Sequence, residues 1–139
     1  MQIVIEKVVQ KLYLSDYAAE YGDKALQVWV NPSRKILQER IAQAEQGKEL
    51  RSELDGLAKG SPDLERMRVI LDELGNIGKI SLAWMSEILS QGTEDTHISA
   101  DELTAFVNEC EELDPGFYAW ISKRVWEMIG DHRLQKKKA

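Results

Sequence analysis

Few residues of this sequence have side chains that could do chemistry. Cys110 is the single cysteine of the 139 residues, and His97 and His132 are the two histidines. One cysteine excludes a disulfide within the chain and a cysteine-rich zinc site. Adjacent carboxylates such as Asp72 and Glu73 point in different directions on a helix, so they are poorly placed for acid–base catalysis. The sequence also has no glycine-rich phosphate loop and no nucleophile turn, so we predict a protein that is not an enzyme and has no catalytic, cofactor or metal site.

One segment resembles the second half of a calcium-binding EF-hand loop. Residues 91–102 end in Ile-Ser-Ala-Asp-Glu, as such loops do. The position that needs a glycine for the sharp turn holds Thr96, and only Asp95 and Glu102 would supply charged ligands. A helix capping box explains Ser99 and Glu102 without any ion. A degenerate calcium-loop regulator is therefore the less favoured alternative function.

Charge is distributed unevenly along the chain, whose net charge is -6. Residues 91–114 contain eight acidic residues and no lysine or arginine, whereas residues 115–139 contain six basic residues and two acidic ones. The overall acidity argues against nucleic acid as a partner. The complementary segments predict electrostatic docking, either between copies of the chain or onto a charged partner; a solvated helix face followed by a basic tail is the alternative. Lys136, Lys137 and Lys138 are the candidate interface residues of the basic segment.

Two of the four tryptophans do not lie at positions where a hydrophobic core is expected. Trp84 and Trp120 lie on the apolar faces of their expected helices. Trp29 alternates with Val28 and so points to the other face of its expected strand, and Trp126 lies about one residue off the apolar stripe of its helix. A tryptophan outside the core covers a second layer or anchors an interface. Trp29 and Trp126 are therefore candidate protein-interface residues.

The first thirty residues predict a β-hairpin. Residues 26–30 alternate between apolar and other side chains, which is the period of a strand with one buried face. The run 8–14 is rich in valine and leucine and is its expected partner. The connecting residues 15–24 contain a Tyr-Gly-Asp turn signal, so the hairpin has a long loop.

The rest of the chain has the apolar spacing and the capping residues of about six short amphipathic helices. Expected helix starts combine a capping side chain with proline or glutamate, at Asn31-Pro32, Ser61-Pro62-Asp63, Ser99 and Asp114-Pro115. Expected ends and breaks lie at the glycines 47, 60, 75, 78 and 92. We therefore predict a mainly α fold, an irregular bundle of helices with a small N-terminal β-hairpin.

The length predicts a single domain over residues 1–139. Within it we expect a hairpin arm at 1–31, a helical body at 32–133 and a basic tail at 134–139. No apolar run is long enough for a membrane span, and the N-terminal residues do not have the pattern of a secretory signal. We therefore expect a cytoplasmic protein without a membrane partner.

Three features of the sequence resemble a known family. Residues 26–37 form a short strand that runs through Asn31-Pro32 into a helix, Trp84 lies in a later helix, and Asp114-Pro-Gly-Phe117 opens a helix rich in aromatic residues. This organisation is similar to that of small tail assembly chaperones of long-tailed bacteriophages, over roughly two-thirds of the chain.

The resemblance implies a non-enzymatic helper in the host cytoplasm. It would coat the tape measure protein and bring tail tube subunits to it. Self-association is expected separately, from the complementary charged segments and from Trp29. The alternative is a structural subunit that stays in the phage particle, such as a connector or a minor tail protein.

Overall fold

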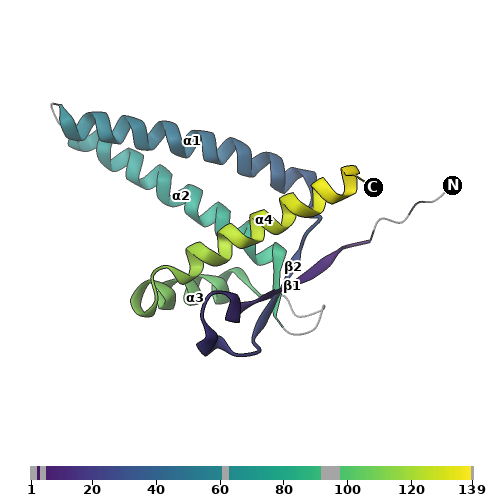
Figure 1. Cartoon of the computed structure of the whole chain (residues 1–139). Coiled ribbons are helices and arrows are strands. Elements are labelled where there is room, and N and C mark those ends of the chain that lie inside the picture. Colours follow the sequence, from purple (N-terminus) through teal and green to yellow (C-terminus); the bar gives the residue numbers. More distant parts are fainter. Residues whose placement is uncertain (1–2, 4–5, 61–62, 92–97, 139) are drawn as a thin grey trace. The chain divides into compact units, whose positions relative to one another are not determined.

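The computed structural model describes residues 3, 6–60, 63–91 and 98–138. In these residues the chain is mainly helical, with a small antiparallel sheet near its N-terminus (Figure 1). This confirms the mainly α character and the small N-terminal hairpin of the predicted fold. In chain order the elements are β1 (Val9–Tyr13), the short 3-10 helices η1 (Leu14–Asp16) and η2 (Ala19–Tyr21), β2 (Ala25–Trp29), α1 (Arg34–Lys59), α2 (Leu64–Ile88), β3 (Leu89–Gln91), α3 (Ala100–Leu113) and α4 (Phe117–Lys138).

Strands β1 and β2 form the predicted hairpin. They are antiparallel, and Leu12 lies opposite Leu26 in the register. Val28 and Val30 are fully buried, as the alternation predicts. The long link between the strands folds into η1 and η2.

A third strand, β3, was not predicted. It follows α2 directly and pairs antiparallel with β2, with Leu89 opposite Val28, so β2 is the central strand of the sheet. Three residues are too few to show a strand period, and the apolar spacing of the preceding helix extends into them. Pairing with β2, which is distant in the sequence, decides their conformation.

The described residues contain four α-helices, so the prediction of about six is wrong. The two expected short helices on either side of Gly47 are one helix, α1, and α2 continues through Gly75 and Gly78. A glycine inside a helix costs only about 1 kcal/mol relative to alanine. Each of these helices has 25 or 26 residues, and the backbone hydrogen bonds and burial along them outweigh that cost.

The start of α1 lies two residues beyond the predicted cap. Ser33 is the N-cap, and its Oγ accepts a hydrogen bond from the backbone N–H of Ile36 at 3.4 Å. Asn31 instead joins the hairpin to the chain before β1. Its Oδ1 accepts a hydrogen bond from the Val8 N–H at 2.6 Å, and its Nδ2 donates to the Glu6 carbonyl at 3.0 Å.

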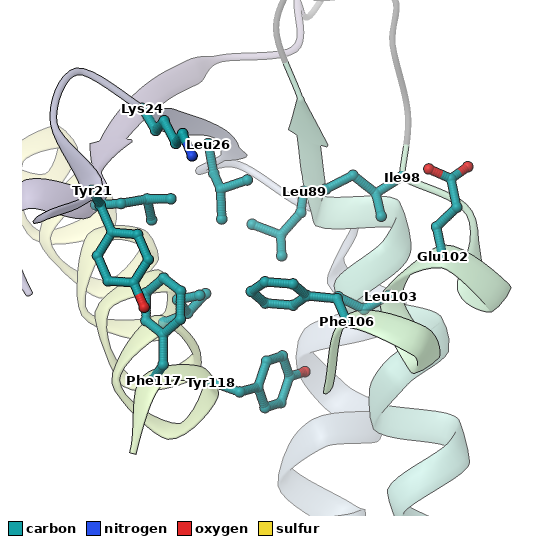
Figure 2. Close-up of a pocket in the computed structure, with 12 residues that line it drawn as sticks. Tyr21, Lys24, Leu26, Leu89, Ile98, Glu102, Leu103, Phe106, Phe117 and Tyr118 are labelled. Carbon is teal, nitrogen blue, oxygen red and sulfur yellow. The ribbon is translucent and has the colours of Figure 1, made fainter. Parts of the chain in front are cut away.

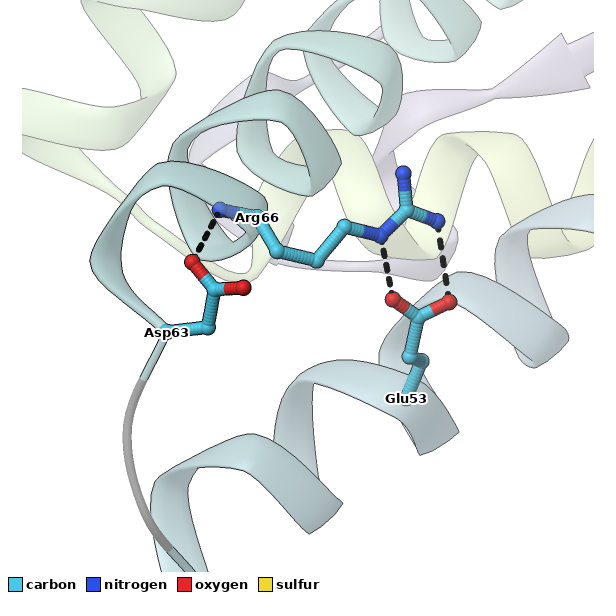
Figure 3. Close-up of polar contacts among 3 residues, drawn as sticks. All are labelled: Glu53, Asp63 and Arg66. Carbon is cyan, nitrogen blue, oxygen red and sulfur yellow. Dashed lines mark hydrogen bonds and ion pairs between the residues drawn. The ribbon is translucent and has the colours of Figure 1, made fainter.

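One other predicted cap is confirmed and one differs. At the predicted start Ser61-Pro62-Asp63, the capping side chain is that of Asp63, which was expected in the first turn of the helix: its Oδ1 accepts a hydrogen bond from the backbone N–H of Arg66 at 3.1 Å (Figure 3). Ser99 Oγ accepts from the Glu102 N–H at 3.1 Å, which is the predicted cap of α3, and the Ser99 hydroxyl also donates to the Glu102 carboxylate. Each cap satisfies a backbone donor at the helix start that has no partner within the helix.

The chain divides into two compact units. We call residues 1–32 and 85–139 the sheet unit and residues 33–84 the helical-hairpin unit. The prediction of one domain stays a prediction. Residues 134–138, expected as a basic tail, continue helix α4.

In the helical-hairpin unit, α1 and α2 run antiparallel (Figure 1). The Arg66 guanidinium on α2 binds the Glu53 carboxylate on α1 with two hydrogen bonds, one of 2.9 Å from Nη2 to Oε1 (Figure 3). This bond holds the pKa of Glu53 below its usual value. Further along the pair, the indole N–H of Trp84 donates to Glu39 Oε2 at 2.9 Å. Trp84 is buried, as predicted.

In the sheet unit, one face of the sheet and the inner faces of α3 and α4 supply buried apolar side chains. The most deeply buried of these are Leu12, Val28, Val30, Leu89, Leu103, Ile121 and Val125. They come from alternate positions of the strands and from positions three or four apart on the helices, which is the pattern of elements with one buried face. The sheet unit therefore has its own hydrophobic core.

Candidate functional site

An aromatic cluster ties the link between β1 and β2 to the start of α4. The phenol of Tyr17 donates a hydrogen bond to Asp114 Oδ1 at 2.7 Å, and that of Tyr21 donates to Asp114 Oδ2 at 3.3 Å. The ring of Phe117 stacks on both tyrosines, with centroids 5.0 Å from Tyr17 and 4.4 Å from Tyr21. The hydrogen bond to the Asp114 carboxylate, followed by burial, raises the pKa of Tyr17 to about 12.

Beside this cluster the sheet unit has an apolar pocket of about 280 Å³ (Figure 2). The sheet contributes Leu26 and Leu89 to its walls, α3 contributes Phe106, and α4 contributes Tyr118 and Ile121. Burial raises the pKa of Tyr118 to about 12, so its phenol is neutral at ordinary pH. The pocket is thus built from four elements, of which β2 is distant in the sequence from the other three.

The pocket has one basic and one acidic lining residue. Lys24 precedes β2 and Glu102 lies in the first turn of α3. Both side chains are exposed, so they are solvated next to apolar walls. A site of this kind can bind an apolar group by removing it from water. The two charged side chains can then orient polar groups of the ligand that lie next to the apolar group.

A second candidate surface lies on α2. Leu64, Leu71, Gly75 and Gly78 are exposed, and their spacings of seven, four and three residues place them on one side of the helix. Leu64 is 75 % exposed and Leu71 is 56 % exposed. We call these four residues the α2 stripe. It combines two large apolar side chains with two positions where another backbone can come close.

Trp29, predicted as an interface residue, is half-buried on β2. The Lys7 ammonium lies over its ring, 4.6 Å from the centroid. Its indole N–H is buried and has no hydrogen-bond acceptor among the described residues. The cation–π contact covers one face of the indole. A role for Trp29 in binding stays a prediction.

The other predicted interface residues share helix α4. Trp126 is half-buried, and Lys136 is exposed. Lys137 and Lys138 form the end of the helix. Their roles in binding also stay predictions.

The side chains that could do chemistry are few in the described part of the chain. Cys110 is buried, as predicted, and burial raises the pKa of its thiol, which keeps it protonated. His97 and most of the degenerate calcium loop lie outside the described residues. Among the residues that are described, no three or more histidine, cysteine, aspartate or glutamate side chains are grouped so that they could hold a metal ion.

Sequence reasoning missed the pocket. Phe106, Phe117 and Ile121 have the spacing of apolar faces of helices in the sequence, but periodicity does not distinguish a filled core from a core that leaves a space. No local signal marks the pocket, because whether side chains fill the space between elements depends on how the distant elements pack.

None of the helices in the described part of the chain has the length and apolar character needed to cross a membrane. No family model, no curated protein and no solved structure matches the chain.

Proposed function

We propose that the protein is a non-enzymatic assembly chaperone of phage or prophage tails, which binds the tape measure protein and tail tube subunits. The exposed α2 stripe is the observation that carries this proposal. The resemblance in organisation to small tail assembly chaperones supplies the identity of the partners.

The α2 stripe is suited to another helix. Leu64 and Leu71 are two helical turns apart, which is the repeat at which apolar side chains of a partner helix recur. Gly75 and Gly78 have no side chains, and nothing lies within 4 Å of the place where a Cβ would stand on either residue. A partner helix could therefore approach closely there while the two leucines contact its apolar side.

Exposed leucines at this spacing fit a chaperone role. A transient binder must keep its apolar binding surface in water when it is free, whereas the surfaces of obligate subunits stay covered. In α2 the leucines are flanked by charged residues, such as Asp72 and Glu73 after Leu71. Such flanking charges keep the free protein in solution and form the polar rim of a transient interface.

The test is co-expression with the tape measure protein encoded in the same genome. We expect the wild-type chain to keep the tape measure protein in solution and to co-purify with it. Leu71→Glu should reduce the co-purified amount about tenfold or more, because it places a charge in the centre of an apolar interface. The matched control is Ile41→Glu on α1, since Ile41 is 59 % exposed and lies outside the stripe.

Equal loss of binding in both variants, or no loss in Leu71→Glu, would contradict the assignment of the surface. Failure of the wild-type chain to bind the tape measure protein would contradict the function itself. Mass spectrometry of purified particles then separates the two main alternatives. A chaperone is absent from mature particles, whereas a connector or a minor tail protein is present in them.

A further inference from the structure

We propose that the pocket of the sheet unit binds Leu134 of a second copy of the protein, so that copies associate head to tail. This goes beyond the proposed function and does not require it, because both sites lie on this chain. The pocket, the residues around Leu134 and the geometry of α4 carry the inference.

The pocket has the size and walls for one large aliphatic side chain with part of its helix. Its volume is about 280 Å³, whereas apolar cavities of about 150 Å³ accept a benzene-sized group. Leu26, Leu89 and Phe106 form its interior (Figure 2). An inserted leucine would replace water along these walls.

Leu134 is an exposed apolar side chain in a basic setting. It is 57 % exposed on α4, between the exposed side chains of Arg133 and Lys136. Other exposed leucines have acidic neighbours. Leu113 follows Glu111 and Glu112, and Leu71 precedes two acids.

The charges beside the pocket complement those beside Leu134. Glu102 lines the pocket, and Asp101 and Glu109 are exposed on the same helix, α3, which has no lysine or arginine. Arg133 of the second copy, which lies to the side of Leu134 on the helix, would face these acids, whereas Lys136 lies on the far side of the helix.

The basic residue of the pocket lining also has a counterpart. Lys24 lines the pocket on the side of the sheet, and the exposed Asp131 precedes Leu134 by three residues on α4. Relative to Leu134, Asp131 and Arg133 lie on opposite sides of the helix. A single orientation of α4 can therefore match both charges of the lining.

The chain cannot fill the pocket with its own Leu134. Ile121 lines the pocket, and Leu134 lies thirteen residues further along the same continuous helix. At 1.5 Å per residue the two positions are about 20 Å apart along the axis. The occupant must therefore come from another copy. The contact that we propose joins two different surfaces and is not reciprocated within a pair, so it is heterologous and builds rings or open chains; a reciprocal contact would instead close as a two-fold dimer.

Sedimentation velocity of the full chain tests the proposal. At low salt the wild type should form concentration-dependent oligomers, which weaken as salt screens the charges. Leu134→Asp should weaken association about tenfold or more. Leu113→Asp is the matched control, since Leu113 is also an exposed leucine near a helix end, at 75 % exposure, and should associate as the wild type does.

A mixing experiment tests the head-to-tail geometry. Ile98→Asp places a charge in the pocket lining, where Ile98 is half-buried; Glu102→Lys serves if the first variant does not fold. A pocket variant and Leu134→Asp should each be monomeric alone. Mixed, they should form a one-to-one dimer that grows no further, because one intact pocket meets one intact Leu134.

Three results would overturn the proposal. The first is that the wild type stays monomeric at low salt and high concentration. The second is that Leu134→Asp forms oligomers as the wild type does. The third is that the mixture of a pocket variant with Leu134→Asp stays monomeric. If Leu134→Asp loses self-association but still binds the tape measure protein, the proposed chaperone function is not affected. The two proposals can therefore be refuted independently.

Discussion

At the scale of single residues, Asp114 connects two distant parts of the sheet unit. Its carboxylate accepts hydrogen bonds from the phenols of Tyr17 and Tyr21, and Tyr17 lies 97 residues earlier in the chain. A carboxylate next to a phenol stabilises the neutral phenol, because ionisation would place two negative charges side by side. The cluster therefore makes stability depend on pH in the alkaline range.

The first prediction concerns this pH dependence. The pKa of Tyr17 rises from 10.0 to about 12 on folding. A raised pKa means that its contribution to stability is complete below pH 10 and is lost as the pH rises towards 12. The melting temperature of the wild type should therefore fall over this range.

Asp114→Asn is the test variant, because it removes the charge and keeps the shape. We expect tyrosinate absorbance to show Tyr17 ionising closer to pH 10 in this variant. Tyr118 is the internal control, since burial raises its pKa and Asp114 does not. An unchanged titration of Tyr17 would show that the hydrogen bond to Asp114 does not control its pKa.

At the scale of elements, helix α2 contains two glycines that its fold does not need. Gly75 and Gly78 lie in the middle of a 25-residue helix and have open space where a Cβ would stand. Alanine fits both positions and restricts the unfolded chain more than glycine does. The open space at both positions leaves room for the close approach of the partner helix that we propose.

The second prediction is that Gly75→Ala stabilises the protein by about 0.5–1 kcal/mol, measured by urea denaturation. The same variant should weaken binding of the tape measure protein, because its methyl group projects from the α2 stripe. Gly22→Ala is the contrasting control. Gly22 has a φ of 61° and a ψ of -127°, a sparsely populated conformation that costs on the order of 1–3 kcal/mol with a side chain. A stabilised variant with full binding would exclude Gly75 from the interface.

At the scale of the whole molecule, the distribution of charge bears on the association that we propose. The chain has a net charge of -6 and an isoelectric point near 5.0, with acids concentrated on α3 and bases at the end of α4. Far above the isoelectric point, general repulsion keeps copies apart, while the local match between α3 and α4 attracts them.

The third prediction follows from this balance. Solubility should be lowest near pH 5, where the net charge vanishes, and should rise again towards pH 7. Turbidity against pH, measured at low salt, checks it. Leu134→Asp adds a negative charge and weakens the proposed contact, so its turbidity maximum should be smaller and should lie at a lower pH. A turbidity maximum far from pH 5 would show that net charge does not control association.

The sequence by itself determined the features that depend on neighbouring residues. Alternation around Val28 predicted the buried face of β2, and Ser99 with Glu102 predicted the start of α3. These signals are reliable because a strand period or a cap involves residues within a few positions of each other.

Only the tertiary structure decided the features that depend on distant residues. Strand β3 exists because β2 pairs with it, Asn31 binds the backbone before β1 and does not cap a helix, and α1 continues through Gly47. The pocket is the clearest case, since its walls come from the sheet, α3 and α4. Local patterns show which side chains turn inward. Whether they fill the space between the elements depends on how those elements pack, because packing is settled by the shapes of all of them together.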